Sequence, residues 1–113
     1  MLEPFDAVDV IRVKRDGGTV SEAELRWLVD AYTRGYVTDP QMAAFAMAVF
    51  LRGMSRDEIR VLTDAMIASG ERMSFASLSK VTVDKHSTGG VGDKITLPLA
   101  PLVASFGVAV PQL

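Results

Sequence analysis

One local motif, present three times, constrains this chain more than any other feature. In each copy a serine or threonine stands three residues before a glutamate or glutamine. The pairs are Ser21 with Glu24, Thr38 with Gln41, and Ser55 with Glu58. Such a pair is a capping box, in which two side chains satisfy backbone amide groups at the start of a helix. Together with the glycines that punctuate the chain, the motif predicts short helices with defined starts and ends.

The first 70 residues therefore read as four short helices. The first is predicted from about Pro4 or Asp6 to Asp16, where Gly17-Gly18 ends it. Pro40 occupies the tolerated first turn of the third helix. The apolar positions with helical spacing are Phe5, Val8 and Ile11 in the first helix, Leu25, Leu28, Val29 and Tyr32 in the second, and Ile59, Leu62, Met66 and Ile67 in the fourth.

The third helix differs from the others because residues 42–51 contain no polar side chain. A helix that is apolar all round is expected to be covered on nearly every side. Four short helices cannot enclose it completely, so an apolar surface remains for a second subunit or for helices from further along a longer chain.

The last third of the chain follows a different pattern. A β-branched run at residues 81–84 predicts a buried parallel strand, and residues 108–110 resemble the next strand. Between them a helix is predicted to begin at Asp93 or Thr96. Pro98 and Pro101 must sit early in that helix or break its first turn.

The fold class predicted from these patterns is mainly α. A helical domain occupies residues 1–70, a linker follows at 71–79, and residues 80–113 form the first strand, loop and helix of an α/β domain that is truncated here. One such unit cannot bury both faces of its sheet.

Composition excludes several classes of function. The chain has 113 residues and a net charge of −2, so electrostatics gives no reason to expect nucleic acid as a partner. It contains no cysteine, which excludes disulfides and cysteine-ligated metals and suits a cytoplasmic protein. We expect no signal peptide and no membrane span, because no apolar run approaches about 18–20 residues.

The stretch KVTVDKHSTGGVGDK, residues 80–94, is the candidate functional site. A strand leads into a turn that contains Gly89, Gly90 and Gly92, and a helix follows. Glycines allow consecutive backbone amides to converge on an anion, and a helix N-terminus adds partial positive charge. The spacing is neither that of a P-loop nor that of a dinucleotide-binding turn. By spacing alone, a tight strand-to-helix connection remains an equal alternative.

Side chains around this turn would suit a phosphate beside a histidine. Lys85 offers a point charge, and Ser87 and Thr96 offer hydroxyl donors. His86 is the only histidine, and at the carboxyl end of a predicted strand it can donate a hydrogen bond or a proton to a leaving base.

As a whole string, DKHSTGGVGDK resembles the signature of the thymidine and pyrimidine-nucleoside phosphorylases. The resemblance extends over essentially the whole chain and includes RDGG, YTRG, QMAAFAMAVFLRGM and LAPLVASFGVAVP. It implies reversible phosphorolysis of thymidine or pyrimidine deoxynucleosides to the free base and 2-deoxyribose 1-phosphate. Family members are several times longer. We therefore expect an N-terminal part of such an enzyme, inactive alone.

The resemblance also implies roles for individual residues. The histidine that matches His86 contacts the pyrimidine near its O2, so His86 is the predicted catalytic residue. The predicted phosphate-binding residues are Lys85, Ser87 and Thr96 by resemblance, and Gly89 and Gly90 by their backbone amides.

No cofactor is required by this scheme, and inorganic phosphate is the co-substrate. Some pyrimidine-nucleoside members hold a potassium ion at positions that match Gly92 and Lys94. Lys94 replaces a threonine of those members, and its ammonium group disfavours a cation there.

The predicted partners are a pyrimidine nucleoside, phosphate and a second copy of the chain, with a homodimer formed through the helical domain. Two alternatives differ in class. An anthranilate phosphoribosyltransferase-like enzyme shares the helical domain and a glycine-rich loop, but its loop lacks the triplet Lys85-His86-Ser87. A non-enzymatic helical dimerisation module would carry the glycine-rich turn without using it.

Overall fold

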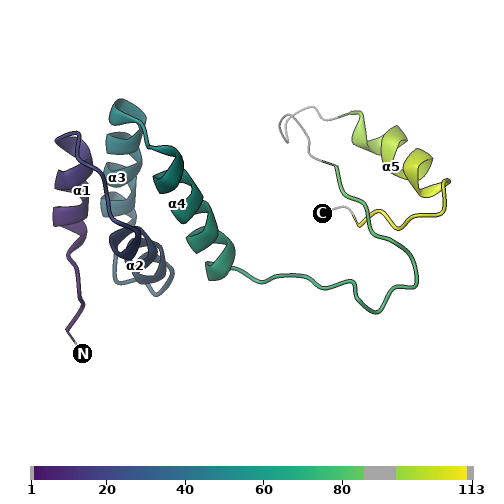
Figure 1. Cartoon of the computed structure of the whole chain (residues 1–113), viewed down its shortest axis with the longest axis horizontal. Coiled ribbons are helices and arrows are strands. Elements are labelled where there is room, and N and C mark those ends of the chain that lie inside the picture. Colours follow the sequence, from purple (N-terminus) through teal and green to yellow (C-terminus); the bar gives the residue numbers. More distant parts are fainter. Residues whose placement is uncertain (1, 86–93, 112–113) are drawn as a thin grey trace. The chain divides into compact units, whose positions relative to one another are not determined.

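The structure, a computed structural model, describes residues 2–85 and 94–111 (Figure 1). The chain divides into two compact units, Met1–Arg72 and Met73–Leu113. The first unit holds four helices: α1 (Ala7–Arg15), α2 (Glu22–Thr33), α3 (Asp39–Arg52) and α4 (Arg56–Ser69). In the described part of the second unit, α5 (Thr96–Ala104) is the one helix. The mainly α fold predicted from the sequence is confirmed.

Side-chain hydrogen bonds cap the starts of α1, α2 and α4. At the start of α1 the Asp6 carboxylate accepts a hydrogen bond from the Val8 amide at 2.7 Å. Ser21 and Ser55 are the N-cap residues of α2 and α4, and each forms a capping box with the glutamate three residues later. Because the two capping boxes are local, the sequence was sufficient to predict them.

The first unit is built from two helix pairs. Helix α1 packs along α3 and α2 packs along α4, while α1 also touches α2. Figure 1 shows these four helices side by side. The core between them contains ten buried residues: Ala7, Val10, Val20, Leu25, Trp27, Leu28, Ala31, Val37, Phe45 and Val61.

Helix α1 confirms the predicted apolar stripe only in part, because Phe5 and Ile11 pack against the core but the fully buried residues are others. Ala7, Val10 and Lys14 are its buried residues, while Val8 is 42% exposed. The same holds for α4, which buries Glu58, Val61 and Ala65. On the predicted apolar face of α4, Ile59, Met66 and Ile67 are each about half exposed. In both helices the buried face includes a charged residue that periodicity alone assigned to solvent.

Lys14 and Glu58 explain this choice of face because they form a buried ion pair. Lys14 Nζ lies 2.7 Å from Glu58 Oε1, and each side chain is 4% exposed. Lys14 Nζ also donates to the carbonyl oxygen of Gly53 at 3.2 Å. The Glu58 carboxylate accepts from the Val20 amide at 2.9 Å and from the Ser55 amide at 2.8 Å. One cluster therefore joins α1, the connection from α1 to α2, the connection from α3 to α4, and α4.

The surroundings of Glu58 favour its charged form. Burial opposes ionisation, but the hydrogen bond from Lys14 and those from the Ser55 and Val20 amides outweigh it and lower the pKa to about 2. The glutamate is therefore ionised throughout the neutral range, and its charge is compensated inside the bundle.

Helix α3 keeps much of its apolar surface exposed, as expected from its sequence. Only Phe45 and Ala48 are buried, whereas Met47 is 56%, Phe50 82% and Leu51 70% exposed. The four-helix unit therefore presents an apolar surface that its own helices do not cover.

The second unit contains little regular structure among its described residues. The predicted strands meet at a single parallel bridge between Thr82 and Ala109, and residues 81–84, predicted to be buried, are exposed. Two hydrogen bonds support it, from the Val83 amide to the Ala109 carbonyl and from the Ala109 amide to the Val81 carbonyl, both 2.9 Å. A pair of strands without further neighbours is marginal, which explains why the ladder is so short.

Helix α5 differs from its prediction at one proline. Pro98 lies in the first turn, where proline is tolerated, but Pro101 lies inside the helix. Proline has no amide hydrogen, so position 101 cannot donate to the carbonyl four residues earlier, at Leu97. Leu97 is 80% exposed.

Candidate anion-binding site

The described structure provides the two flanks of the predicted phosphate site. On one side, Lys85 follows the bridged segment and is half-buried, and its amide donates to Asp84 Oδ1 at 2.8 Å. In parallel pairing, side chains that follow the carboxyl end of a strand lie where α/β proteins bind ligands.

On the other side, Thr96 is the first residue of α5. The N-cap residue is Ile95, which makes no side-chain cap hydrogen bond. Backbone amides in a first helical turn carry partial positive charge and attract anions. Lys94 precedes this turn and is exposed.

The residues between these flanks include most of the predicted site. His86, Ser87, Gly89, Gly90 and Gly92 lie outside the described residues. Their predicted roles, like those of Lys85, Lys94 and Thr96, stay predictions.

Several cavities occur in the four-helix unit, and two of them have distinct linings. The first, of about 490 Å³, is an apolar slot between α2, α3 and α4. Leu28 and Val29 of α2, Met42 and Val49 of α3, and Met66 of α4 are among its lining residues. We call this cavity the α2–α3–α4 slot. No sequence pattern predicted it, because it depends on how three helices pack together.

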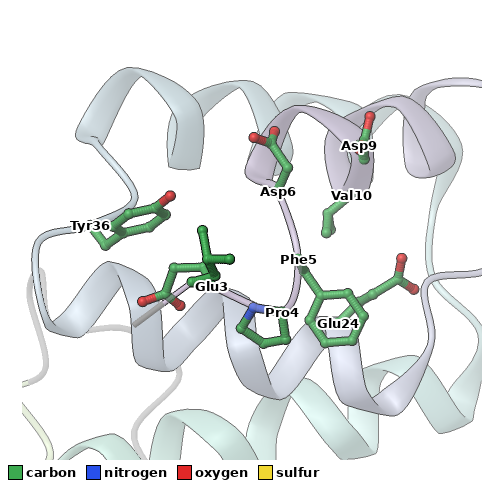
Figure 2. Close-up of a pocket in the computed structure, with 9 residues that line it drawn as sticks. Glu3, Pro4, Phe5, Asp6, Asp9, Val10, Glu24 and Tyr36 are labelled. Atoms are coloured by element: carbon green, nitrogen blue, oxygen red, sulfur yellow. The ribbon is translucent and has the colours of Figure 1, made fainter.

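The second cavity, of about 480 Å³, lies beside the N-terminal segment (Figure 2). Several acidic side chains line it, but they already have partners. Glu3 accepts from Arg34 at 3.1 Å and from Trp27 Nε1 at 2.7 Å, and the hydrogen bond from Arg34, followed by that from Trp27, lowers its pKa. Asp6 caps α1, and Glu24 belongs to the capping box of α2. These carboxylates hold the N-terminal segment against α2 and stabilise helix starts.

Two further observations concern metals and membranes. In the part of the chain that the structure describes, no group of three or more histidine, cysteine, aspartate or glutamate side chains is placed to hold a metal ion. None of the helices in residues 2–85 and 94–111 has the length and hydrophobicity needed to cross a membrane.

Comparison with known families identifies the family of the four-helix unit. Residues 8–70 match the helical bundle domain of the glycosyl transferase family, and this chain belongs to that family. The chain is similar, more particularly, to the thymidine phosphorylase of Mycobacterium tuberculosis (strain ATCC 25618 / H37Rv), with 62% identity over 108 residues. That match covers 96% of this chain and 25% of the relative.

Other relatives are named thymidine phosphorylase or pyrimidine-nucleoside phosphorylase. The pyrimidine-nucleoside phosphorylase of Geobacillus stearothermophilus is 48% identical over 106 residues, which is 94% of this chain and 24% of the relative. The thymidine phosphorylase of Rhizobium meliloti (strain 1021) is 50% identical over 105 residues, which is 93% of this chain and 24% of the relative. The chain thus spans about a quarter of the length of the curated relatives it matches.

Proposed function

We propose that this chain supplies the helical bundle and the first phosphate-binding elements of a pyrimidine-nucleoside phosphorylase. The observation that carries the proposal is the 62% identity over 108 residues with a thymidine phosphorylase. An alignment that includes 108 of the 113 residues necessarily contains the glycine-rich turn. The chain covers only a quarter of that relative, so we expect activity from the longer protein and none from these residues alone.

The proposed reaction is the reversible phosphorolysis of thymidine or a related pyrimidine nucleoside. An oxygen of inorganic phosphate forms a bond to C1′ of the sugar as the bond from C1′ to the base nitrogen breaks. The electron pair of the broken bond stays on the base nitrogen, which takes up the proton that hydrogen phosphate releases, and the products are the free base and a pentose 1-phosphate. As in other glycosyl transfers, the transition state has oxocarbenium character.

In this reaction the phosphate-binding residues act by position and charge. Lys85 supplies a positive charge to the phosphate dianion, and the hydroxyls of Ser87 and Thr96 and the amides of Gly89 and Gly90 orient it. The positions of Lys85 after a bridged segment and of Thr96 at a helix start support this assignment, because both kinds of position favour anions.

His86 acts on the other substrate. Its imidazole donates a hydrogen bond to the pyrimidine O2 and so stabilises the negative charge that develops on the base as it leaves. It is therefore the catalytic residue of this part of the site.

The remaining features of the proposal concern the setting of the enzyme. It is a homodimer formed through the helical bundle, supported by the exposed apolar surface of α3. It requires no cofactor, and a cytoplasmic location fits a chain without cysteine. A potassium ion at Gly92 and Lys94 is a separate prediction. To test whether the lysine replaces the ion, the rate of phosphorolysis is measured in potassium chloride and in sodium chloride. The protein with Lys94 is compared with the Lys94→Thr variant.

A chimera provides the direct test of phosphorolysis. This chain replaces the matching segment of the Mycobacterium tuberculosis relative, and release of thymine from thymidine is followed at several phosphate concentrations. We expect the chimera to be active. Lys85→Ala is expected to lower kcat/KM for phosphate about 10²–10³-fold, the usual cost of losing one group that holds a reacting anion.

A matched control distinguishes the loss of a lysine at the proposed phosphate site from the loss of a positive charge elsewhere. Lys80→Ala removes an exposed lysine five residues earlier and is expected to leave kcat/KM within about twofold of the chimera. His86→Ala is expected to lower kcat and to change the KM for phosphate much less, because the imidazole acts on the base. An active chimera that tolerates both Lys85→Ala and His86→Ala would refute the assigned roles. An inactive but folded chimera would favour the dimerisation module.

A further inference from the structure

One carboxylate of the N-terminal segment is held by two groups on the same side of α2. Glu3 Oε1 accepts from Arg34 Nη1 at 3.2 Å, and Glu3 Oε2 accepts from Arg34 Nη2 at 3.1 Å. Glu3 Oε2 also accepts from Trp27 Nε1 at 2.7 Å. A guanidinium group that binds both oxygens of a carboxylate gives a strong and geometrically specific contact. Trp27 and the C-cap residue Arg34 are seven positions apart, so both lie on one side of the helix.

Both donors are held in place by contacts that do not involve Glu3. Asp30, one turn before Arg34, accepts from Arg34 Nε at 2.8 Å and leaves the two terminal nitrogens for another carboxylate. Trp27 is 7% exposed, and its ring packs edge-on against Tyr36 with ring centroids 6.4 Å apart. A site whose donors are already positioned loses little conformational entropy when a ligand binds. We call the pair Trp27 and Arg34 the α2 carboxylate site.

Residues 2–6, which we call the N-terminal strap, reach this site as an extended segment. The side chains alternate along it: Glu3 and Phe5 are half-buried, whereas Leu2 and Pro4 are exposed. Figure 2 shows the strap along the cavity that it lines. Because a proline restricts the residue before it to extended conformations, the sequence itself favours the shape in which the strap binds.

Two side chains hold the strap in place. Glu3 makes the polar contacts, and Phe5 packs edge-on against Trp27 with ring centroids 5.9 Å apart. In the part of the chain that the structure describes, no backbone hydrogen bond joins residues 2–5 to the helices. A segment held in this way can dissociate while the helices behind it stay folded.

We propose that the α2 carboxylate site binds extended acidic peptides and that the N-terminal strap is its built-in ligand. The preferred ligand carries a glutamate and, two residues later, an aromatic side chain, as Glu3 and Phe5 do. The strap and an added peptide compete for the same two donors. The strap is favoured by its high local concentration, so the site accepts another segment once the strap is displaced. The inference does not depend on the reaction that the longer protein performs.

The charges around the site favour a single carboxylate over a more highly charged anion. Asp30 already shares Arg34, and Asp6, Asp9 and Glu24 line the neighbouring cavity. These carboxylates repel a phosphate dianion more strongly than they repel one carboxylate. The α2 carboxylate site is therefore different in specificity from the phosphate site proposed above.

A peptide added to the full chain tests the site. The double variant Glu3→Ala/Phe5→Ala removes both contacts of the strap and keeps all 113 residues. A peptide with the sequence of residues 2–6, LEPFD, blocked at both ends, is titrated while the fluorescence of Trp27 is recorded. The peptide contains no tryptophan, so the signal comes from the protein alone. We expect saturable binding, about tenfold or more tighter in the double variant than in the wild-type chain.

Changes in the peptide and in α2 show which groups recognise the ligand. The same peptide with glutamine in place of its glutamate is expected to bind about tenfold or more weakly, because it lacks the charge that pairs with a guanidinium group. Arg34→Ala, added to the double variant, is expected to weaken binding as much. Arg26→Ala is the matched control, because Arg26 lies on α2, is 43% exposed and contacts Glu22 and Asp64 instead of the strap. Inorganic phosphate at equal ionic strength is expected not to displace the peptide.

Three results would overturn the proposal. They are a double variant that keeps its helices by circular dichroism and binds no peptide, equal binding of the glutamate and glutamine peptides, and a loss with Arg26→Ala as large as with Arg34→Ala. Hydrogen exchange at the single indole N–H gives a second measurement that does not require the double variant. We expect this exchange to be about tenfold or more slower in the wild-type chain than in Glu3→Ala, and equal rates would also overturn the proposal.

Discussion

Removal of the charge on Glu58 is the strongest test of how the four-helix unit is held together. In Glu58→Gln the side chain keeps its size and one carbonyl oxygen, so the packing around it changes little. The Lys14 ammonium, 4% exposed, loses the carboxylate that lies 2.7 Å away. It keeps its hydrogen bond to the Gly53 carbonyl. The amide nitrogen of Gln cannot accept a hydrogen bond, so the cost combines an uncompensated buried charge with the loss of the bond from Ser55 or of those from Val20 and Lys14.

The structure allows a rough magnitude for this loss. The pKa of Glu58 falls from 4.5 to about 2, which corresponds to about 3 kcal/mol of stabilisation of the folded state at neutral pH. Breaking a buried ion pair by removing one partner typically costs about 3–5 kcal/mol, which agrees. We expect Glu58→Gln to lower the free energy of unfolding by about 3 kcal/mol.

Urea denaturation followed by the fluorescence of Trp27 measures this change. Trp27 is the only tryptophan and is 7% exposed in α2, so it reports on the four-helix unit. Asp9→Asn is the control, because it breaks an exposed pair with Arg12 and should cost less than about 1 kcal/mol.

A double-mutant cycle completes the test. Lys14→Met is expected to cost about as much as Glu58→Gln, and the double variant is expected to cost clearly less than the sum, because no buried charge remains in it. If Glu58→Gln costs no more than Asp9→Asn, the ion pair does not stabilise the bundle and the reasoning is wrong.

The same ion pair predicts a dependence on pH. The folded-state pKa of Glu58 lies below its unfolded value of 4.5, so its contribution is complete above about pH 4.5 and is lost as the pH falls toward 2. We expect the difference in unfolding free energy between the wild type and Glu58→Gln to shrink across this interval. A difference that stays constant from pH 6 to pH 2.5 would contradict the assigned pKa.

Further predictions concern the residues at helix ends, both glycines and a capping serine. Gly53 has φ +72°, so Gly53→Ala is expected to cost about 1–3 kcal/mol in urea denaturation, while Gly70→Ala, at φ −107°, should be within about 1 kcal/mol of the wild type. Ser21→Ala removes the cap of α2 and is expected to cost about 1 kcal/mol, whereas Ser21→Thr should retain most of the stability. Equal stability of the two glycine variants, or of the two Ser21 variants, would contradict these expectations.

Local chemistry made most of the helical architecture predictable. A serine three residues before a glutamate satisfies amides that every helix start leaves unpaired, and it does so whatever surrounds it. Ser21 and Ser55 therefore indicated the starts of α2 and α4 correctly. The phosphate site was predicted from a different signal, the string of residues around His86. Its geometry depends on side chains and amides that local patterns do not position.

Apolar periodicity was a weaker guide to the buried faces. It favoured Val8 in α1 and Ile59 in α4, yet both are about half exposed. The structure instead buries Lys14 and Glu58, which are unfavourable in a core singly and acceptable as a pair. Their partnership spans 44 residues of sequence, and a pattern within one helix contains no information about it.

The sequence by itself determined where the four helices begin and end, because capping and glycine conformation act within a few residues. It also determined that α3 would keep an apolar surface, since a helix without polar residues cannot be covered by three short neighbours. Only the tertiary structure decided which face of each helix points inward and where the α2–α3–α4 slot opens. Those outcomes depend on contacts between distant residues, and their energies become defined only when the helices pack together.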